Sequence, residues 1–166
     1  MTEPAVIDSL EFARSGQQMQ GSVAVAQLPR LADSLFDTVG ELRFALAGVI
    51  DAQQRPRLEL RVEGEINLKC QRCLGPVAYP LAVASSLLVL GNSAGGETAK
   101  IGDLDAVPAG PGVEVQALVE DEVLLAIPLS PRHDEGQCSL AVAAPGERGA
   151  SPFAVLAEWK HGKLRN

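Results

Sequence analysis

Aromatic residues, long apolar runs and an excess of positive charge are all missing from this chain of 166 residues. Aromatics make up only 4% of it, so its core has to be built from Val, Leu, Ile and Ala. No run of about 18 apolar residues is present, and we therefore expect no membrane span. The start, Met1-Thr2-Glu3-Pro4, lacks a basic region followed by an apolar run, so we also expect no secretion signal.

Positive charge is scarce, because 14 Lys and Arg stand against 21 Asp and Glu, for a formal net charge of −7. Contacts with phosphate groups need Lys and Arg, so such a chain is a poor non-specific binder of nucleic acid. We expect no binding to DNA. Any contact with RNA would have to come from a local basic patch or through a protein partner.

Catalytic motifs are also missing: there is no Gly-x-Ser-x-Gly, no phosphate-binding glycine loop and no His-Glu-x-x-His. Cys73 and His133 could form a nucleophile pair, but no third orienting group or oxyanion donor accompanies them. A thioredoxin-like site has its Cys-x-x-Cys at a helix N-terminus, whereas Gly75-Pro76 and a strand-like run follow here. We predict that the protein is not an enzyme. A Cys-dependent redox enzyme is the alternative, and it requires a thiol of low pKa.

What the chain does have is a set of cysteines in one pattern. Cys70 and Cys73 form a Cys-x-x-Cys turn, and Cys138 follows His133 by five residues. Such a turn directs two sulfurs to one point, and a second loop can add a nitrogen and a third sulfur for tetrahedral Zn²⁺. We therefore predict a possible zinc site at these four residues. The alternative is a reduced turn with an unrelated buried Cys138 and a solvent-facing His133.

Alternation of apolar and polar residues predicts the strands of an antiparallel sheet at residues 19–25, 41–50, 58–69 and 77–90. Gly64 interrupts the third of these strands and suggests a bulge or a change of register. The Cys-x-x-Cys then lies at the tip of a hairpin, which is an exposed and firmly flanked place for metal ligands.

Apolar residues at helical spacing predict the main helix over residues 114–127. In this helix Glu120 and Asp121 should point outward, while Glu122 lies close to the apolar stripe and needs a partner. Shorter helices are predicted over residues 28–36 and directly after Asp8, which could serve as an N-cap.

These elements predict an α+β fold with a single domain over residues 1–140, in which an antiparallel sheet is packed by one main helix. The segment 91–112 is rich in Gly, Pro and Ala, and we predict a mobile loop there. Residues 141–166 are predicted to be a flexible linker and a helical tail. Ser151 followed by Pro152 is a strong helix start for this tail.

Five residues are candidates for contact with RNA or with a protein partner. Lys69, Arg72 and Arg132 flank the predicted metal ligands and would form one small positive patch if the two loops meet. Trp159 and Lys160 lie in a second basic segment, where the indole could stack on a base. The alternatives are scattered solubilising charges and a tail helix that simply packs through Trp159.

Several segments follow one another in an order that matches a known family: Gln27–Leu31, Leu68–Cys73, Val119–Pro128 with His133-Asp134 and Cys138, and Pro152–Leu156. In these segments the chain resembles the bacterial YceD family. The matches spread over most of the chain, so the resemblance is more specific than one short motif. The segments 91–112 and 139–150 depart from the family.

The resemblance implies a cytoplasmic, non-enzymatic factor of ribosome biogenesis that is needed for accumulation of 23S rRNA, through its synthesis, processing or stability. It implies that the family's Cys-x-x-Cys is Cys70 and Cys73, and that its His-x4-Cys is His133 and Cys138. The implied partners are large-subunit rRNA or its assembly factors. The alternative function is an acidic adaptor that binds a ribosomal protein or an assembly enzyme without contacting RNA.

Overall fold

The computed structural model describes residues 5–91 and 105–138. Its elements in chain order are β1 (Val6–Ile7), α1 (Ser9–Arg14), β2 (Gln18–Ala24), 3-10 turns at Val25–Gln27 and Pro29–Leu31, β3 (Glu41–Ile50), β4 (Pro56–Lys69), β5 (Pro76–Leu90), β6 (Ala106–Pro108), β7 (Val113–Glu114) and α2 (Val115–Ala126). Among these elements no helix is long and apolar enough to cross a membrane.

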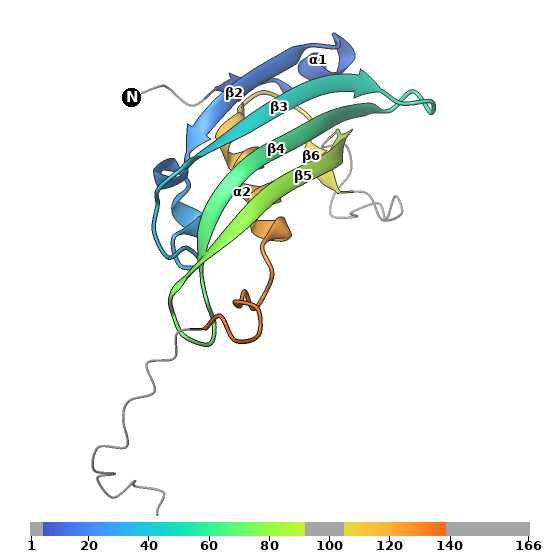
Figure 1. The fold of residues 1–166 in the computed structure, drawn as a ribbon. Helices are drawn as coiled ribbons and strands as arrows, with labels where there is room; N and C mark the ends of the chain where they lie inside the picture. Colours follow the sequence, from blue (N-terminus) through green and yellow to red (C-terminus); the bar gives the residue numbers. More distant parts are fainter. Residues whose placement is uncertain (1–4, 92–104, 139–166) are drawn as a thin grey trace, which may run out of the picture.

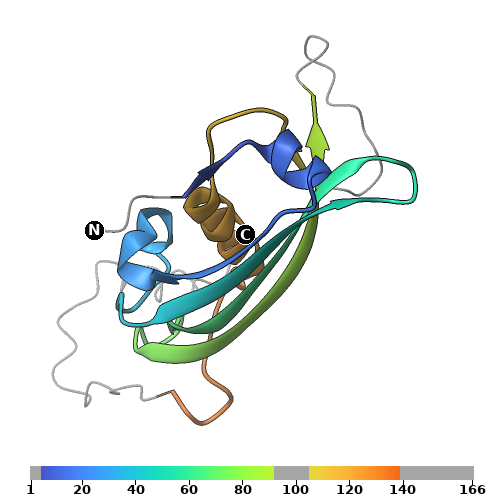
Figure 2. The ribbon, with the colours of Figure 1, turned by 90° about the horizontal axis from the view of Figure 1, so that it is seen from above.

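A curved sheet of five strands, in the order β2-β3-β4-β5-β6, forms the body of the molecule (Figure 1). Neighbouring strands are antiparallel except β5 and β6, which run parallel. The sheet curves around α1 and α2, which lie on its concave side (Figure 2). The short strands β1 and β7 pair with each other in a second, smaller sheet. The predicted α+β class is confirmed.

The core lies between the concave face of the sheet and α2, and aliphatic residues fill nearly all of it. The apolar positions of the alternating strands point inward, as the period of two requires, and these include Leu42, Leu46, Leu58, Leu60, Val62, Ile66 and Leu68. From α2, Val115, Leu118, Val119 and Val123 are buried against them. Each such Leu contributes about 1.5–3 kcal/mol by leaving water.

Toward β5, Gly64 marks neither a bulge nor a change of register, whereas the pairing of β4 with β3 ends directly before it, at Arg43–Glu63. The register of β4 with β5 runs without interruption through the pair Gly64–Leu81. A Cβ on residue 64 would lie 2.6 Å from Leu42 Cδ2 and 3.0 Å from the Glu41 carbonyl oxygen. Glycine stands here because β3 approaches too closely for any side chain, and the strand itself stays regular.

The helix predicted over residues 28–36 is wrong, because this segment forms only a 3-10 turn at Pro29–Leu31. Its apolar side chains are nonetheless used as expected, since Leu28, Leu31 and Leu35 are buried. Leu35 bridges to Leu68 of β4, and this pairing draws the segment into extended backbone. Phe36, in contrast, is 46% exposed.

The loop predicted over residues 91–112 is wrong in part. Ala106–Pro108 forms β6, which adds to the edge of β5, whereas residues 92–104 lie outside the described part of the chain. The predicted tail, residues 141–166, lies outside it as well. The short helix after Asp8 is confirmed, and the Asp8 carboxylate caps it by accepting from Glu11 N at 2.9 Å.

The acidic residues of α2 are arranged differently from the prediction. Glu120 does not point outward: it is 5% exposed, and its carboxylate accepts the backbone N–H of Arg30 at 2.6 Å. Glu122 is buried too, and it has found the partner it needs in the Ser85 hydroxyl of β5. Asp121 remains half-exposed and pairs with the Arg30 side chain. Two of the three carboxylates therefore tie α2 to its neighbours.

At the turn between β3 and β4, the Asp51 carboxylate accepts backbone N–H bonds from Gln53 and Arg55. It also pairs with the side chains of Arg55 and Arg57, at 2.8 and 2.9 Å. Burial opposes ionisation of this carboxyl, but the bonds from Arg55 and Gln53 prevail and lower the pKa of Asp51 from 3.8 to about 2. The turn between β3 and β4 is thus stabilised by the ionised Asp51 carboxylate and its two arginine partners.

We expect Asp51→Asn to lower the free energy of unfolding at neutral pH. Because the folded-state pKa lies below the unfolded value, this contribution is present above about pH 4 and is lost as the pH falls through about 2. The gap between wild type and variant in urea unfolding should therefore close over that range. Asp33→Asn, at an exposed carboxylate, is the control and should open no such gap. A gap that stays constant down to about pH 2 would contradict this role.

Candidate metal centre

The two loops that carry the predicted metal ligands meet at one end of the molecule. Figure 1 shows the loop after α2 lying beside the tip of the β4–β5 hairpin. The sulfur atoms of Cys70, Cys73 and Cys138 and a ring nitrogen of His133 all lie within 4.8 Å of one another. Sequence reasoning thus named a set of residues that the fold does bring together.

The hairpin supplies the first loop. β4 ends at Lys69, and the turn is closed by Cys70 N donating to the Gly75 carbonyl at 2.9 Å and by Leu74 N donating to the Cys70 carbonyl at 2.9 Å. Leu74 takes a φ of 61°, which is unusual for a bulky residue and turns the chain sharply after Cys73. Both sulfurs therefore face the same side of the turn.

The segment after α2 supplies the second loop. The Pro131 carbonyl accepts the backbone N–H of Gln71 at 2.8 Å, which fastens this segment to the hairpin tip. The Nε2 atom of His133 donates to the Pro76 carbonyl at 2.8 Å. This bond fixes the ring tautomer and leaves Nδ1, the atom that faces the sulfurs, free to bind a cation.

The distances within the cluster fit a tetrahedral metal ion. Cys70 Sγ lies 3.6 Å from Cys138 Sγ, while His133 Nδ1 lies 3.4 Å from Cys73 Sγ and 3.5 Å from Cys138 Sγ. Bond lengths of about 2.3 Å for Zn–S and about 2.0 Å for Zn–N place neighbouring ligand atoms about 3.5–3.8 Å apart in a tetrahedron, which is close to these three distances. Three sulfurs and one imidazole nitrogen form a donor set suited to Zn²⁺. The cluster could therefore hold a metal such as zinc.

Local hydrogen bonds favour negative charge on two of the sulfurs. Burial opposes ionisation of the Cys70 thiol, but the backbone N–H groups of Cys73 and Arg72 outweigh it and lower the pKa of Cys70 from 9.0 to about 5. Burial also opposes ionisation of Cys138, and there the Arg72 guanidinium and the His133 ring prevail and lower the pKa. These two thiols are prepared to bind a cation as thiolates.

The close packing of these groups raises the pKa values of the third thiol, Cys73, and of the His133 imidazole. The Gly75 N–H favours the thiolate of Cys73, but burial and the neighbouring sulfurs prevail and raise the pKa of Cys73. The thiol of Cys138 and the Pro76 carbonyl raise the pKa of His133. A bound cation relieves both effects, because it displaces the protons and neutralises the sulfurs.

The low-pKa thiol that a redox enzyme would require is Cys70, yet its side chain has no exposed surface. The turn leads into β5 and no helix begins there. A buried thiolate that reagents cannot reach fits a metal ligand better than a thiol that exchanges with a substrate.

Three of the candidate contact residues stand beside cluster residues on the two loops that meet. Lys69 and Arg72 lie on the hairpin turn beside Cys70, and Arg132 lies on the second loop beside His133. Arg72 and Arg132 are exposed, and Lys69 is half-exposed. Trp159 and Lys160 lie outside the described residues. Sequence reasoning missed Pro76 and Pro131, whose carbonyl groups join the two loops, because backbone acceptors leave no trace in a residue pattern.

Comparison with known proteins gave consistent results. A family model described as "Large ribosomal RNA subunit accumulation protein YceD" matches residues 58–158, which include all four residues of the cluster. A protein of the same description from Haemophilus influenzae is 26% identical, and the alignment covers 95% of each chain. No solved structure matches the chain significantly.

We expect zinc to stabilise the chain and Cys138→Ser to remove that stabilisation, because the variant lacks one of four ligands. At a free zinc concentration of about 100 times the dissociation constant, the metal should add about 2.7 kcal/mol. The measurement is thermal unfolding with zinc and after removal of zinc by a chelator. Gln71→Ala is the matched control, since Gln71 lies in the same turn but binds its neighbour loop only through its backbone. Identical melting of the wild-type chain under both conditions would contradict the site.

Proposed function

The chain belongs to the YceD family, and from this membership we propose that it is a non-enzymatic, cytoplasmic factor of ribosome biogenesis that supports the synthesis, processing or stability of 23S rRNA. The name of the family and of the Haemophilus influenzae relative refers to accumulation of the large ribosomal RNA subunit. The way in which this chain acts is our proposal.

The proposal rests on one observation: potential metal ligands and positively charged residues lie on the same two loops. Four potential metal ligands and the cations Lys69, Arg72 and Arg132 lie together at one end of a chain whose net charge is −7. In an acidic protein, a local group of cations held on a rigid support is where contact with phosphate is favourable. We propose that Zn²⁺ at Cys70, Cys73, His133 and Cys138 holds this support in place.

In this proposal the metal has a structural role. The donor set is complete with four protein ligands, as in structural zinc sites, and leaves no open position for a substrate. When bound, the ion would supply only a rigid link between the hairpin tip and the segment after α2. The chain's own residues would make the contact: Arg72 and Arg132 project from the two linked loops, so their separation depends on that link.

We further propose that the chain divides into a domain over residues 1–140 and a tail over residues 141–166. Trp159 and Lys160 in the tail would supply a second contact, through stacking of the indole and one further positive charge. Such a tail would add affinity for RNA of any sequence, because every base offers a face on which the indole can stack.

A protein adaptor is the second candidate function. A hollow between α2 and β6 favours it. This hollow, of about 310 Å³, is lined by Asp105, Asp121 and Glu122, by Arg30, which pairs with Asp121, and by apolar residues that include Leu125. Leu125 is 73% exposed there, which is unusual for a leucine on a helix. Asp121 pairs with Arg30 and Glu122 is buried against Ser85, so the exposed Asp105 and Leu125 are the groups open to a partner. A negative charge beside an apolar side chain suits a basic ribosomal protein better than RNA.

Replacing Arg72 and Arg132 together by Gln should weaken binding to large-subunit rRNA and reduce its accumulation in cells that depend on the protein. Because two phosphate contacts are lost, the slope of log K against log salt should fall by about 1.5. The matched control is Arg43→Gln with Arg61→Gln, which removes the same charge from exposed positions on β3 and β4. Zinc content is measured in every variant, because Arg72 also favours the thiolate of Cys138 and its loss could weaken the metal site as well as the contact with phosphate.

Equal losses in the two double variants would contradict a contact surface at the cluster loops. Absence of rRNA binding by the wild-type chain, with salt-sensitive binding to a basic ribosomal protein, would select the adaptor instead.

A further inference from the structure

Within residues 5–91 and 105–138, the outer edge of β2 is open and carries none of the usual protections. β2 stands at the end of the strand order, and among the described residues no strand pairs with its outer side. Its sequence, Gln-Met-Gln-Gly-Ser-Val-Ala, contains no charge and no proline. Its register with β3 is regular from Gln18 to Ala24, so no bulge turns the edge away. Natural sheets avoid such edges unless something covers them.

The direction of the backbone groups along this edge follows from two hydrogen bonds. Gly48 N donates to the Gln17 carbonyl at 2.8 Å, and Val25 N donates to the Gly40 carbonyl at 3.0 Å. Antiparallel pairing alternates, so the odd-numbered residues of β2 exchange hydrogen bonds with β3. The even-numbered residues, Gln18, Gln20, Ser22 and Ala24, therefore present their N–H and C=O groups outward.

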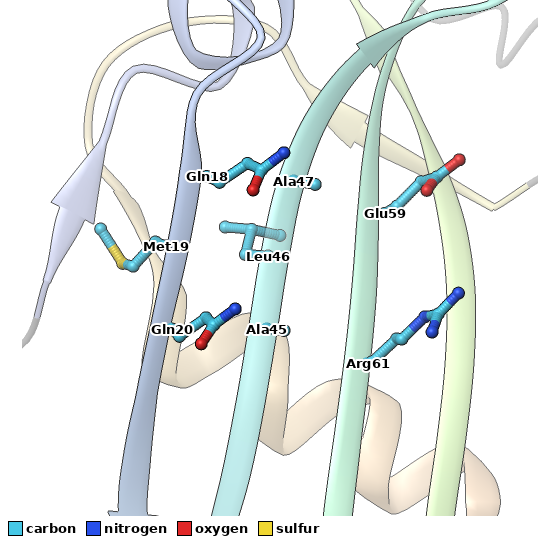
Figure 3. Close-up of a pocket in the computed structure, with 8 residues that line it drawn as sticks. All are labelled: Gln18, Met19, Gln20, Ala45, Leu46, Ala47, Glu59 and Arg61. Carbon is cyan, nitrogen blue, oxygen red and sulfur yellow. The ribbon is translucent and has the colours of Figure 1, made fainter.

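The side chains alternate in the same way. Figure 3 shows Gln18 and Gln20 on one side of β2 and Met19 directed to the other. A hollow of about 370 Å³ runs beside the edge, and its wall combines the apolar side chains of Met19, Val23, Phe44 and Val115 with the polar ones of Gln20, Ser22, Gln27 and Gln116. A Cβ on Gly21 would lie 2.8 Å from Phe44 Cζ, so this ring covers the bare glycine on one side. The edge thus combines unused backbone groups with a hollow of mixed polar and apolar lining.

We propose that this edge is covered by a second copy of the chain, with β2 paired antiparallel to β2 of the partner about a two-fold axis at Gly21. In this register Met19 lies opposite Val23 of the partner subunit, and Gln20 lies opposite Ser22 of the partner subunit. The pairing joins the two five-stranded sheets into one continuous sheet.

A second copy is favoured as the occupant because the edge is complementary to itself. An interface with two-fold symmetry requires one patch to match its own copy. About Gly21, even-numbered residues meet even-numbered ones, so every outward N–H and C=O finds a partner. Apolar side chains meet on the side of Met19 and polar side chains meet on the other. The strand has no charge, so no like charges face each other across the pair.

The interface lies apart from the cluster loops and does not depend on the metal or on the proposed function. It uses the edge formed by β2, whereas the cluster lies at the tip between β4 and β5 (Figure 1). A dimer of this kind would present two copies of the cluster end on one rigid support.

Sedimentation equilibrium of the full-length chain over a concentration series tests the proposal. The wild-type chain should approach twice its mass of 17.4 kDa. Gln20→Pro should remain a single chain at the same concentrations, because it removes an outward N–H that β3 does not use, and edge strands tolerate proline at such positions. Circular dichroism confirms that the variant keeps its sheet.

A second variant covers the case in which Gln20→Pro does not fold. Gln20→Lys adds the charge that natural edges carry and places two lysines diagonally across the two-fold axis, so the dissociation constant should rise by at least about tenfold. Ala84→Lys adds the same charge at an exposed position on β5 and should leave the dimer unchanged. A wild-type chain that stays monomeric, or a dimer that Gln20→Lys does not weaken, overturns the proposal.

Discussion

The unbroken antiparallel register between β4 and β5 is the constraint on which the rest of the structure depends. It runs from Arg57–Leu88 to Lys69–Pro76 and places the Cys-x-x-Cys turn at the far end of a long, stiff hairpin. α2 packs on the inner face of the same hairpin through Val119 and Val123. The first loop is the turn of this hairpin, and the second follows a helix that is packed on the same hairpin. The segment after α2 therefore reaches the turn, and four side chains from the two loops meet.

Much of this arrangement could be predicted from the sequence, because strict alternation and helical spacing are local signals. The strands β3, β4 and β5 and the helix α2 were recognised in this way, and the four cluster residues were recognised from the spacing of their cysteines and histidine. The strand β6 was not, since three residues in a segment rich in Gly and Pro carry no periodicity. Its pairing with β5 depends on a contact across the fold. Burial of Glu120 was missed for the same reason: its partner is the backbone of Arg30, which no residue pattern reveals.

The tip of the β4–β5 hairpin and the outer edge of β2 have different roles. At the hairpin tip, hydrogen bonds to Cys70 and His133 hold these two ligands in place, which lowers the entropic cost of binding a metal. At β2, backbone groups and a hollow of mixed lining face the outer edge of the sheet. A small core built almost wholly of aliphatic residues gains from both, since a metal link and a paired edge each stabilise the folded state.

Zinc K-edge X-ray absorption of the full chain, purified without chelator, tests the central claim most directly, because it reports the atoms bound to the metal. The account predicts one zinc per chain with three sulfurs at about 2.3 Å and one nitrogen at about 2.0–2.1 Å. A sample without zinc, or a zinc ion bound mainly by oxygen, would contradict it. The four residues would then be a packed cluster of side chains that joins the two loops without a metal.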